Sequence, residues 1–389
     1  MRISGDWFEN EDTQAVCRVL SDAGYQALFV GGCVRNALIG AKVSDIDIAT
    51  DATPQTVTQL CEKAGFKVVP TGIEHGTVTV VAGHVPHEIT TFRHDVETDG
   101  RRAVIAFADN VTDDARRRDF TMNALYADAS GQIIDPLSGL DDLKARRVRF
   151  IEDPVERIRE DYLRTLRFFR FHAWYGDPQA GIDKEGLAAV AAHLDGLAKL
   201  SRERVGAEIK KLLRAPDPAP AVAAMRVSGV LAAVLPGADD TALAPLVHAE
   251  QQHQALPCAM RRLACLGGEN LADRLRLSRK ESAALDFFRE ETGTTRSLTM
   301  LAYRNGFDAA LDVALLRQAV LNTPFSQGDL EKAKRAAGQV FPLKAKDLMP
   351  RFSGPALGRK LRELELSWVE SGFSLDRKAL LDMMGDQAE

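Results

Sequence analysis

The feature that most constrains the fold is a short segment near the N-terminus in which a glycine turn joins a strand to a short helix. Leu28 to Val30 is an apolar run of strand type, and Gly31-Gly32 lets the backbone approach a ligand closely. The helix that follows ends at Gly40. Because the first N–H groups of a helix have no partner inside it, the turn presents them, together with Arg35, to an anion.

A second strand follows directly and carries two acidic residues, Asp45 and Asp47. Successive side chains of a strand point to opposite faces, so both carboxylates leave one face while Ile46 and Ile48 are buried on the other. Two such carboxylates suit Mg²⁺, which binds through a few carboxylates plus substrate phosphates. Each element alone fits an ordinary turn or a solvated strand edge, but the ordered series favours a metal-dependent nucleotide site.

Composition narrows the class of protein. The chain has 389 residues and 45% hydrophobic content, enough to bury a sizeable core in two or three domains. Its five cysteines are scattered and lack a C-x-x-C spacing, which argues against disulfides or a zinc site and fits a reducing cytoplasm. No apolar stretch approaches the ~18 residues of a membrane span, and no export signal is present, so we expect a cytoplasmic protein without a membrane partner.

The net charge of −5 argues mildly against a nucleic-acid partner, but the charges are unevenly distributed. Acidic and basic residues cluster in different stretches of the sequence. One face of the folded protein can therefore still be strongly positive. The basic clusters lie at residues 116–118, 144–149, 157–170 and 202–214.

The order of local patterns predicts an α+β fold. Short β-type runs alternate with turns up to residue 135, and helical periodicity takes over from Pro136 onward. Breaks in the helical pattern fall at residues 215–220, where three prolines occur, and at residues 322–328. The predicted strands are residues 27–30, 46–49, 66–69, 78–81, 88–92, 104–107, 124–128 and 132–134.

A second candidate element is Arg117-Arg-Asp-Phe-Thr-Met-Asn-Ala124. Its arginines can hold a triphosphate, while Asp119 and Asn123 can bond ribose hydroxyls; a solvated surface turn is an equally good account of the segment alone. Glu88 lies in a separate strand that could pair beside the Asp45 strand. It is the candidate third carboxylate, with an exposed strand glutamate as the alternative.

The third element is an arginine-rich helix predicted from an Asp153-Pro154 start to about Trp174. Its apolar stripe is predicted to be buried, and its arginines fall on the opposite face. Pairs such as Glu160–Arg164 account for some of the charge at ~0.3–0.5 kcal/mol each. The arginines nevertheless exceed what the acids of the helix can neutralise, which suggests a phosphate or base partner. The stripe consists of Val155, Ile158, Tyr162, Leu166 and Phe169; the arginines are Arg157, Arg159, Arg164, Arg167 and Arg170.

Taken together, residues 24 to 214 resemble the class II transfer-RNA nucleotidyltransferases, which are the CCA-adding enzymes and the related bacterial poly(A) polymerases. Gly31-Gly-Cys-Val-Arg with Asp45-Ile-Asp47 looks like the metal and triphosphate motif, and the segment from Arg117 looks like the ribose-selecting motif. Glu160-Asp-Tyr-Leu-Arg164 resembles the base-reading motif, and Ser201 to Glu208 resembles the helix motif that supports it.

The resemblance implies a nucleotidyltransferase head of the polymerase-beta-like type at residues 1–140. It also implies a helical neck at residues 141–215, and a helical body and tail that bind tRNA at residues 216–389. Asp45 and Asp47 would bind Mg²⁺, with Glu88 as a further catalytic carboxylate. The nucleotide would be held by Gly31, Gly32, Arg35, Arg118, Asp119, Asn123, Glu160, Asp161, Arg164, Arg167 and Arg170. The family usually has aspartate where this chain has Asn36, which puts a local ion pair in doubt.

The implied reaction is template-independent addition of C, C and A to the 3′ end of tRNA from CTP and ATP. Cytosine and adenine both present an amine donor beside a ring-nitrogen acceptor, whereas uracil and guanine present a carbonyl beside an N–H. A carboxylate next to an arginine therefore accepts C and A, and each buried mismatch against U or G costs ~1–3 kcal/mol. Mg²⁺ would assist an in-line displacement of pyrophosphate by the RNA 3′-hydroxyl.

Two other functions stay open. A poly(A) polymerase is the runner-up, although Pro70 to Thr77 together with Glu88 to Arg93 looks like the CCA-adding version. The loop from Arg93 to Phe107, including Asp99-Gly-Arg-Arg102, is present, whereas family members that add only CC tend to have it shortened, so the resemblance favours complete CCA addition. A non-catalytic RNA-binding module on the same fold is disfavoured by the intact carboxylate pair. Oligomeric state does not follow from the sequence.

The C-terminal half carries fewer signals. His248, Glu250 and His253 fit no metal-ligand spacing and are predicted to be exposed helix residues. A glycine turn from Gly354 followed by Arg359-Lys360 resembles the tail segment of the family and could hold an RNA phosphate.

Overall fold

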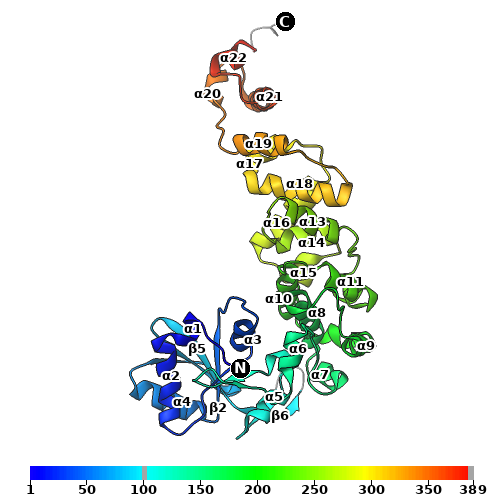
Figure 1. Ribbon diagram of the computed structural model, residues 1–389. Coiled ribbons are helices and arrows are strands. Elements are labelled where there is room, and N and C mark those ends of the chain that lie inside the picture. Colours follow the sequence, from blue (N-terminus) through cyan, green and yellow to red (C-terminus); the bar gives the residue numbers. More distant parts are fainter. Residues whose placement is uncertain (99–102, 384–389) are drawn as a thin grey trace. The chain divides into compact units, whose positions relative to one another are not determined.

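The computed structural model describes residues 1–98 and 103–383, which divide into two compact units. The first unit contains residues 1–237 and 269–276, and the second contains residues 238–268 and those from 277 onward. In the first unit a mixed sheet precedes a series of helices, and the second unit is built from helices (Figure 1). The predicted α+β class is therefore confirmed.

The sheet of the first unit has the strand order β3-β4-β5-β2-β1-β8-β9. Strands β2 and β5 run parallel, and the other neighbours are antiparallel. This parallel pair sets Asp47 of β2 directly beside Glu88 of β5. The strands are β1 (Leu28–Val30), β2 (Ile46–Thr50), β3 (Lys67–Gly72), β4 (Thr77–Ala82), β5 (Val85–Thr91), β8 (Tyr126–Ala127) and β9 (Ile133–Ile134).

One predicted loop contains a strand that the sequence analysis missed. Strands β6 (Arg93–Thr98) and β7 (Ala103–Phe107) pair as a two-stranded antiparallel ribbon, of which only the β7 part was predicted. The run from Arg93 to Thr98 lacks the apolar alternation that marks a strand in sequence. It forms a strand because it pairs with β7. Asp99 to Arg102 lie outside the described residues.

Short helices cover the sheet and connect its strands. Helices α2 and α4 pack on each other and on the β3–β5 side of the sheet, and α3 packs on β1 and β2 (Figure 1). The core beneath them includes Phe29, Ile48 and Phe92, none of which is exposed. The helices are α1 (Asp6–Glu9), α2 (Glu11–Asp22), α3 (Gly32–Leu38), α4 (Pro54–Lys63), α5 (Val111–Arg116) and α6 (Gly139–Lys144), with the 3₁₀ turns η1 (Ile73–His75) and η2 (Thr121–Asn123).

The arginine-rich segment is not one helix. It is divided into α7 (Pro154–Glu160) and α8 (Leu163–Tyr175), because Asp161 adopts an extended conformation with φ −151° and ψ 105°. The prediction of a continuous helix was therefore wrong at this point, although its start at Asp153-Pro154 is confirmed by a side-chain cap on the Val155 N–H. Of the predicted stripe, Ile158, Leu166 and Phe169 are buried, while Val155 and Tyr162 are half-buried.

An aromatic cluster joins the sheet region to these helices. Phe120 contacts Phe150, Phe168 and Phe171, with ring centroids 5.0–6.3 Å apart. Such rings contribute roughly 0.5–1.5 kcal/mol per pair beyond their area burial. The remaining elements of the unit are α9 (Lys184–Ala192), η3 (Leu194–Lys199), α10 (Arg202–Leu213), α11 (Ala219–Val227), α12 (Val230–Val234) and α15 (Leu271–Arg274).

The second unit packs its helices around an apolar core and a buried ionic cluster. The core of its C-terminal part includes Met300, Leu364 and Trp368. None of the helices in the part of the chain that the structure describes has the length and apolar character needed to cross a bilayer. The helices are α13 (Leu243–Gln252), α14 (Ala259–Leu266), α16 (Arg279–Thr292), α17 (Leu298–Asn305), α18 (Phe307–Leu321), α19 (Gln327–Ala336), α20 (Ala345–Leu348), α21 (Gly354–Glu370) and α22 (Arg377–Asp382).

Glu250 was predicted to be exposed, and this was wrong. It is 2% exposed and binds Arg261 and Arg262, whereas His248 is exposed and His253 stacks on Phe325. Glu250 is buried because α14 supplies two guanidinium groups to neutralise it.

Candidate nucleotide and metal site

The two aspartates lie where the strand pattern predicts. Ile46 and Ile48 are buried, Asp47 is half-buried on the opposite face, and Asp45 is exposed immediately before β2. Glu88 is exposed on the neighbouring strand, opposite Asp47 in the register. Asp45, Asp47 and Glu88 therefore belong to one region of the sheet.

The electrostatics of Asp47 show how closely these acids are placed. Burial, followed by the nearby Glu88 carboxylate, raises the pKa of Asp47 to about 6; Asp45 acts in the same direction and Arg118 opposes it. A cation beside Asp47 would relieve this repulsion, and carboxylate oxygens are the donors that a hard divalent ion prefers. Among the described residues, no group of three or more His, Cys, Asp or Glu side chains is placed to hold a metal ion. Asp45 and Asp47 alone would supply part of the shell of a cation, and substrate oxygens would complete it.

The glycine turn brings the backbone against an arginine. Gly31 has φ +71°, a conformation that glycine adopts without strain, and α3 begins at the next residue. A Cβ on Gly31 would lie 3.4 Å from Arg118 Nη1. Both the backbone angle and the closeness of Arg118 therefore favour glycine here.

Arg35 is held by neutral partners. Its guanidinium donates to Asn36, Asn123 and the Tyr175 hydroxyl, and it lies 4.0 Å from the centre of the Tyr175 ring. Burial lowers the pKa of Arg35, which is 5% exposed. Asn36 stands where the family usually has aspartate. Its side-chain oxygen accepts a hydrogen bond from Arg35 at 3.0 Å but brings no negative charge to balance the guanidinium. An anionic ligand beside Arg35 would supply the charge that these partners lack.

Asp119 and Asn123 form a buried pair. The Asn123 amide donates to Asp119 Oδ1 at 2.9 Å, and Arg167 Nε donates to Asp119 Oδ2 at 2.6 Å. Burial alone would raise the pKa of Asp119, but Arg167 and the Asn123 hydrogen bond outweigh it and hold the pKa below its ordinary value. Asp119 is therefore an ionised acceptor at neutral pH.

This shift predicts acid sensitivity of the first unit. A carboxylate with a lowered folded-state pKa contributes stability above its unfolded pKa of about 3.8 and loses it as the pH falls through the folded value. Between those two values one such group changes the free energy of unfolding by about 1.4 kcal/mol per pH unit. We expect Asp119→Asn to reduce the slope of stability against pH below about pH 4, as measured by urea unfolding. An unchanged slope would contradict the assignment, and Asp22→Asn, on an exposed residue, is the control.

The break at Asp161 directs that carboxylate to two fixed donors. Asp161 Oδ1 accepts the Leu163 N–H at 3.1 Å, and Oδ2 accepts from Arg204 at 2.6 Å. Arg204 belongs to α10 and was not among the predicted site residues, although it lies in the Ser201–Glu208 segment that resembles the supporting motif. A partner 43 positions away is invisible to local periodicity.

Arg164 is fixed independently of Asp161. It pairs with Glu160 and donates to the carbonyls of Arg157 and Arg117, the latter at 2.9 Å. Glu160 also pairs with Arg157, so Glu160 orients arginines and does not itself line the cavity. The predicted Glu160–Arg164 pair is confirmed.

The surplus positive charge predicted for this helical segment is smaller than expected. Arg167 pairs with Asp119, and Arg170 pairs with Glu208 of α10. The neutralising acids come from outside the segment, which is why its own sequence overstated the surplus. Arg159 is exposed on α7.

These groups line one cavity of about 590 Å³ within the first unit. Arginines outnumber aspartates in its lining, so the cavity favours anions. Asp45, Glu88 and Glu160 are outside the lining. Arg93, Leu163, Phe171 and Arg204 line the cavity but were not predicted as binding residues. The full lining is Gly31, Gly32, Arg35, Asp47, Arg93, Arg117, Arg118, Asp119, Asn123, Asp161, Leu163, Arg164, Arg167, Arg170, Phe171 and Arg204.

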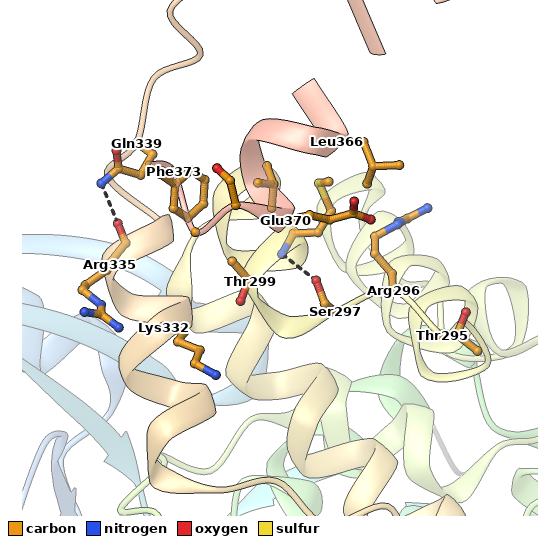
Figure 2. A pocket seen from close by; sticks show the side chains of 14 residues that line it. Thr295, Arg296, Ser297, Thr299, Lys332, Arg335, Gln339, Leu366, Glu370 and Phe373 are labelled. Atoms are coloured by element: carbon orange, nitrogen blue, oxygen red, sulfur yellow. Dashed lines mark hydrogen bonds between the residues drawn. The ribbon is translucent and has the colours of Figure 1, made fainter. Parts of the chain in front are cut away.

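A larger hollow of about 810 Å³ lies in the second unit, among residues of α17, α19 and α21. Figure 2 shows Lys332 and Arg335 of α19 on one side and Leu366 and Glu370 of α21 on another. Glu370 is its single carboxylate among the described lining residues, so it offers no acidic pair for a metal. The size of a cavity therefore does not identify the candidate site. The smaller cavity is the candidate because aspartates and arginines line it together.

Comparison with known proteins supports this assignment. Residues 27–149 match the model of the Poly A polymerase head domain, and residues 181–241 match that of the probable RNA and SrmB-binding site of polymerase A. The mitochondrial CCA tRNA nucleotidyltransferase 1 of Danio rerio is 32% identical over 377 residues, which cover 92% of this chain and 87% of that protein. The chain belongs to the family of CCA tRNA nucleotidyltransferases. The predicted family resemblance is confirmed.

Other members of this family match over different lengths. The human mitochondrial CCA tRNA nucleotidyltransferase 1 is 39% identical over 204 residues, 52% of this chain; the match spans only about half, 47%, of the human protein. The crystal structure of the Bacillus stearothermophilus CCA-adding enzyme in complex with CTP has a TM-score of 0.75 and 27% identity, covering 95% of this chain and 94% of that one. The fold described above is thus the fold of this family.

Proposed function

We propose that the chain adds C, C and A to the 3′ end of tRNA, using CTP and ATP and releasing pyrophosphate. The observation that carries the proposal is the single cavity in which Asp47, the Gly31-Gly32 turn, the arginines and Asp161 meet. A relative of known structure is a CCA-adding enzyme in complex with CTP, which supports a nucleotide in this cavity. The head, neck, and body with tail, at residues 1–140, 141–215 and 216–389, are the proposed functional regions, with tRNA bound by the last.

Asp45 and Asp47 would hold Mg²⁺, with Glu88 as the neighbouring third carboxylate. The raised pKa of Asp47 and the register of Glu88 support this donor set. When bound, the ion would polarise the reacting phosphate and stabilise the charge that develops on pyrophosphate.

The other site residues would bind different parts of the nucleotide. The N-terminus of α3, Arg35 and Arg118 face the cavity and would bind the triphosphate. Asp119 and Asn123 are fixed to each other and would accept from and donate to the ribose hydroxyls. Because the partners of each side chain are already in place, little ordering is needed on binding.

Base selection rests with Asp161 and Arg164, supported by Arg167 and Arg170. Each oxygen of Asp161 already accepts one hydrogen bond, and a carboxylate has about four lone-pair sites, so acceptors are left for the amine of C or A. Arg204 and the Leu163 N–H prevent rotation of the carboxylate. U and G would place a carbonyl oxygen against Asp161 and leave it unpaired.

Asp161→Ala is expected to raise incorporation of UTP and GTP relative to CTP and ATP by about tenfold to a hundredfold, since each buried mismatch costs ~1–3 kcal/mol. The kcat/KM of each nucleotide triphosphate with a tRNA lacking its 3′ end measures this. Glu156→Ala removes an exposed acid of α7 and should leave the preference unchanged. An unchanged preference in Asp161→Ala would count against the base-reading role.

Stepwise incorporation tests the function itself. With a tRNA that lacks its 3′ end, Mg²⁺ and each nucleotide, CTP incorporation followed by ATP supports CCA addition. Long A tracts would indicate the poly(A) polymerase, and binding without incorporation would indicate the non-catalytic module. The sequence argument from the loop at Asp99–Arg102 lies outside the described residues.

Two smaller proposals concern location and RNA contact. We propose a cytoplasmic location, because all five cysteines are free, as a reducing compartment requires. Gly354 opens α21 and Arg359 is exposed, so Arg359 is the better phosphate ligand of the tail segment. Lys360 already pairs with Glu363 at 2.7 Å.

A further inference from the structure

We propose that Asp114 is a positioning residue for the triphosphate, because it holds both Arg117 and Arg118 in the directions in which they line the cavity. The inference rests on the proposed function and names a residue that does not line the cavity itself. Asp114 lies in α5 and is 0% exposed.

The Asp114 carboxylate contacts two arginines that line the cavity and one buried tyrosine. Oδ1 accepts from Arg117 at 2.7 and 2.8 Å. Oδ2 accepts from Arg118 at 3.0 Å and from the Tyr126 hydroxyl at 2.7 Å. Arg118 also donates to the Tyr126 hydroxyl at 3.1 Å. One buried carboxylate thus orients two guanidinium groups and a phenol.

The position of Arg118 links this cluster to the triphosphate turn. Its Nη1 atom lies 3.4 Å from the point where a Cβ on Gly31 would stand, so it borders the start of α3. The Arg117 carbonyl accepts a hydrogen bond at 2.9 Å from Arg164, which also lines the cavity. A triphosphate held at α3 would therefore meet guanidinium groups whose directions Asp114 sets.

The charge balance explains why a carboxylate is needed. Two guanidinium groups on consecutive residues repel each other, and Asp114 neutralises one of the two positive charges. Burial alone would raise the pKa of Asp114, but Arg118 and Arg117 outweigh it and hold the pKa well below its usual range, so the group is ionised. The remaining N–H groups are fixed before the nucleotide arrives, which removes an ordering cost from binding.

Asp114→Asn tests the inference through the ratio of affinities for CTP and CMP, measured by titration calorimetry without RNA. The amide keeps the shape but cannot accept from both arginines, so we expect the CTP:CMP affinity ratio to fall by about tenfold or more, as for a lost charge-assisted pair. The KM for CTP should rise more than kcat falls, and Asp114→Glu should restore part of the ratio. A purely structural role would reduce the active fraction and leave the ratio unchanged.

Asp109→Asn is the matched control, because Asp109 is an exposed acid shortly before α5. An unchanged ratio in folded Asp114→Asn overturns the inference. Where Asp114→Asn does not fold, Tyr126→Phe decides. It removes the hydroxyl that bonds to both Asp114 and Arg118 and keeps their direct pair, so a smaller fall of the ratio supports the inference and no fall overturns it. If the unaltered chain binds CTP far better than CMP but adds nothing to tRNA, the proposed function fails and the inference stands.

Discussion

Asp45→Ala is expected to lower nucleotide incorporation by at least about a thousandfold, since a catalytic metal contributes several kcal/mol and each 1.4 kcal/mol is tenfold in rate. Asp45 is exposed and accepts a hydrogen bond from the Ser44 hydroxyl at 2.9 Å, so its removal should cost little stability. Binding of tRNA should survive, because the metal ligand does not contribute to the proposed RNA surface. Single-turnover incorporation of CTP, together with tRNA binding by filter retention, measures both effects.

Asp22→Ala is the matched control, since Asp22 is an exposed aspartate at the end of α2 and does not line the cavity. It should retain wild-type incorporation. Turnover by Asp45→Ala within tenfold of the unaltered chain would refute the metal assignment.

Glu250→Ala is expected to destabilise the second unit by about 3–5 kcal/mol, because it leaves buried positive charge without its partner. Glu250 binds Arg261 at 2.7 Å and Arg262 at 2.6 Å, and each of these three side chains is at most 3% exposed. Asp312 still pairs with Arg261 after the change, so the loss at Arg261 is partly compensated. Amide hydrogen exchange of α13 and α14 at rising urea concentration reports this loss directly.

Glu290→Ala provides the comparison, because Glu290 is exposed on α16 of the same unit. Its effect should stay within about 0.5 kcal/mol, as for ordinary surface substitutions. If the two substitutions cost the same, the ionic cluster does not stabilise this unit.

Local signals account for the parts of the fold that could be predicted. The turn from Val30 to Gly32 and the burial of Ile46 and Ile48 follow from residues that are neighbours in sequence, and the structure contains them as expected. The break at Asp161 could not be predicted in the same way. It depends on the Asp161 carboxylate, which accepts hydrogen bonds from the Leu163 N–H and from Arg204 of α10. Such side-chain bonds compete with the backbone bonds of a helix, and the periodicity of apolar residues does not reveal them.

The same distinction applies to the candidate site. The family resemblance implied that Arg167 and Arg170 hold the nucleotide, but it could not assign their partners, Asp119 and Glu208, which lie 48 and 38 positions away. Periodicity places a side chain on a face, whereas pairing depends on how faces meet. Asp114 was overlooked for this reason: its sequence surroundings indicate an ordinary acidic helix, and only the packing makes it the centre of a cluster.

A crystal structure with CTP and Mg²⁺ tests the central claim most directly. The account predicts density for the triphosphate between the start of α3 and Arg118, the cation on Asp45 and Asp47, and the cytosine edge against Asp161 and Arg164. A nucleotide bound away from the Asp47 cavity, with its base facing solvent, would contradict it.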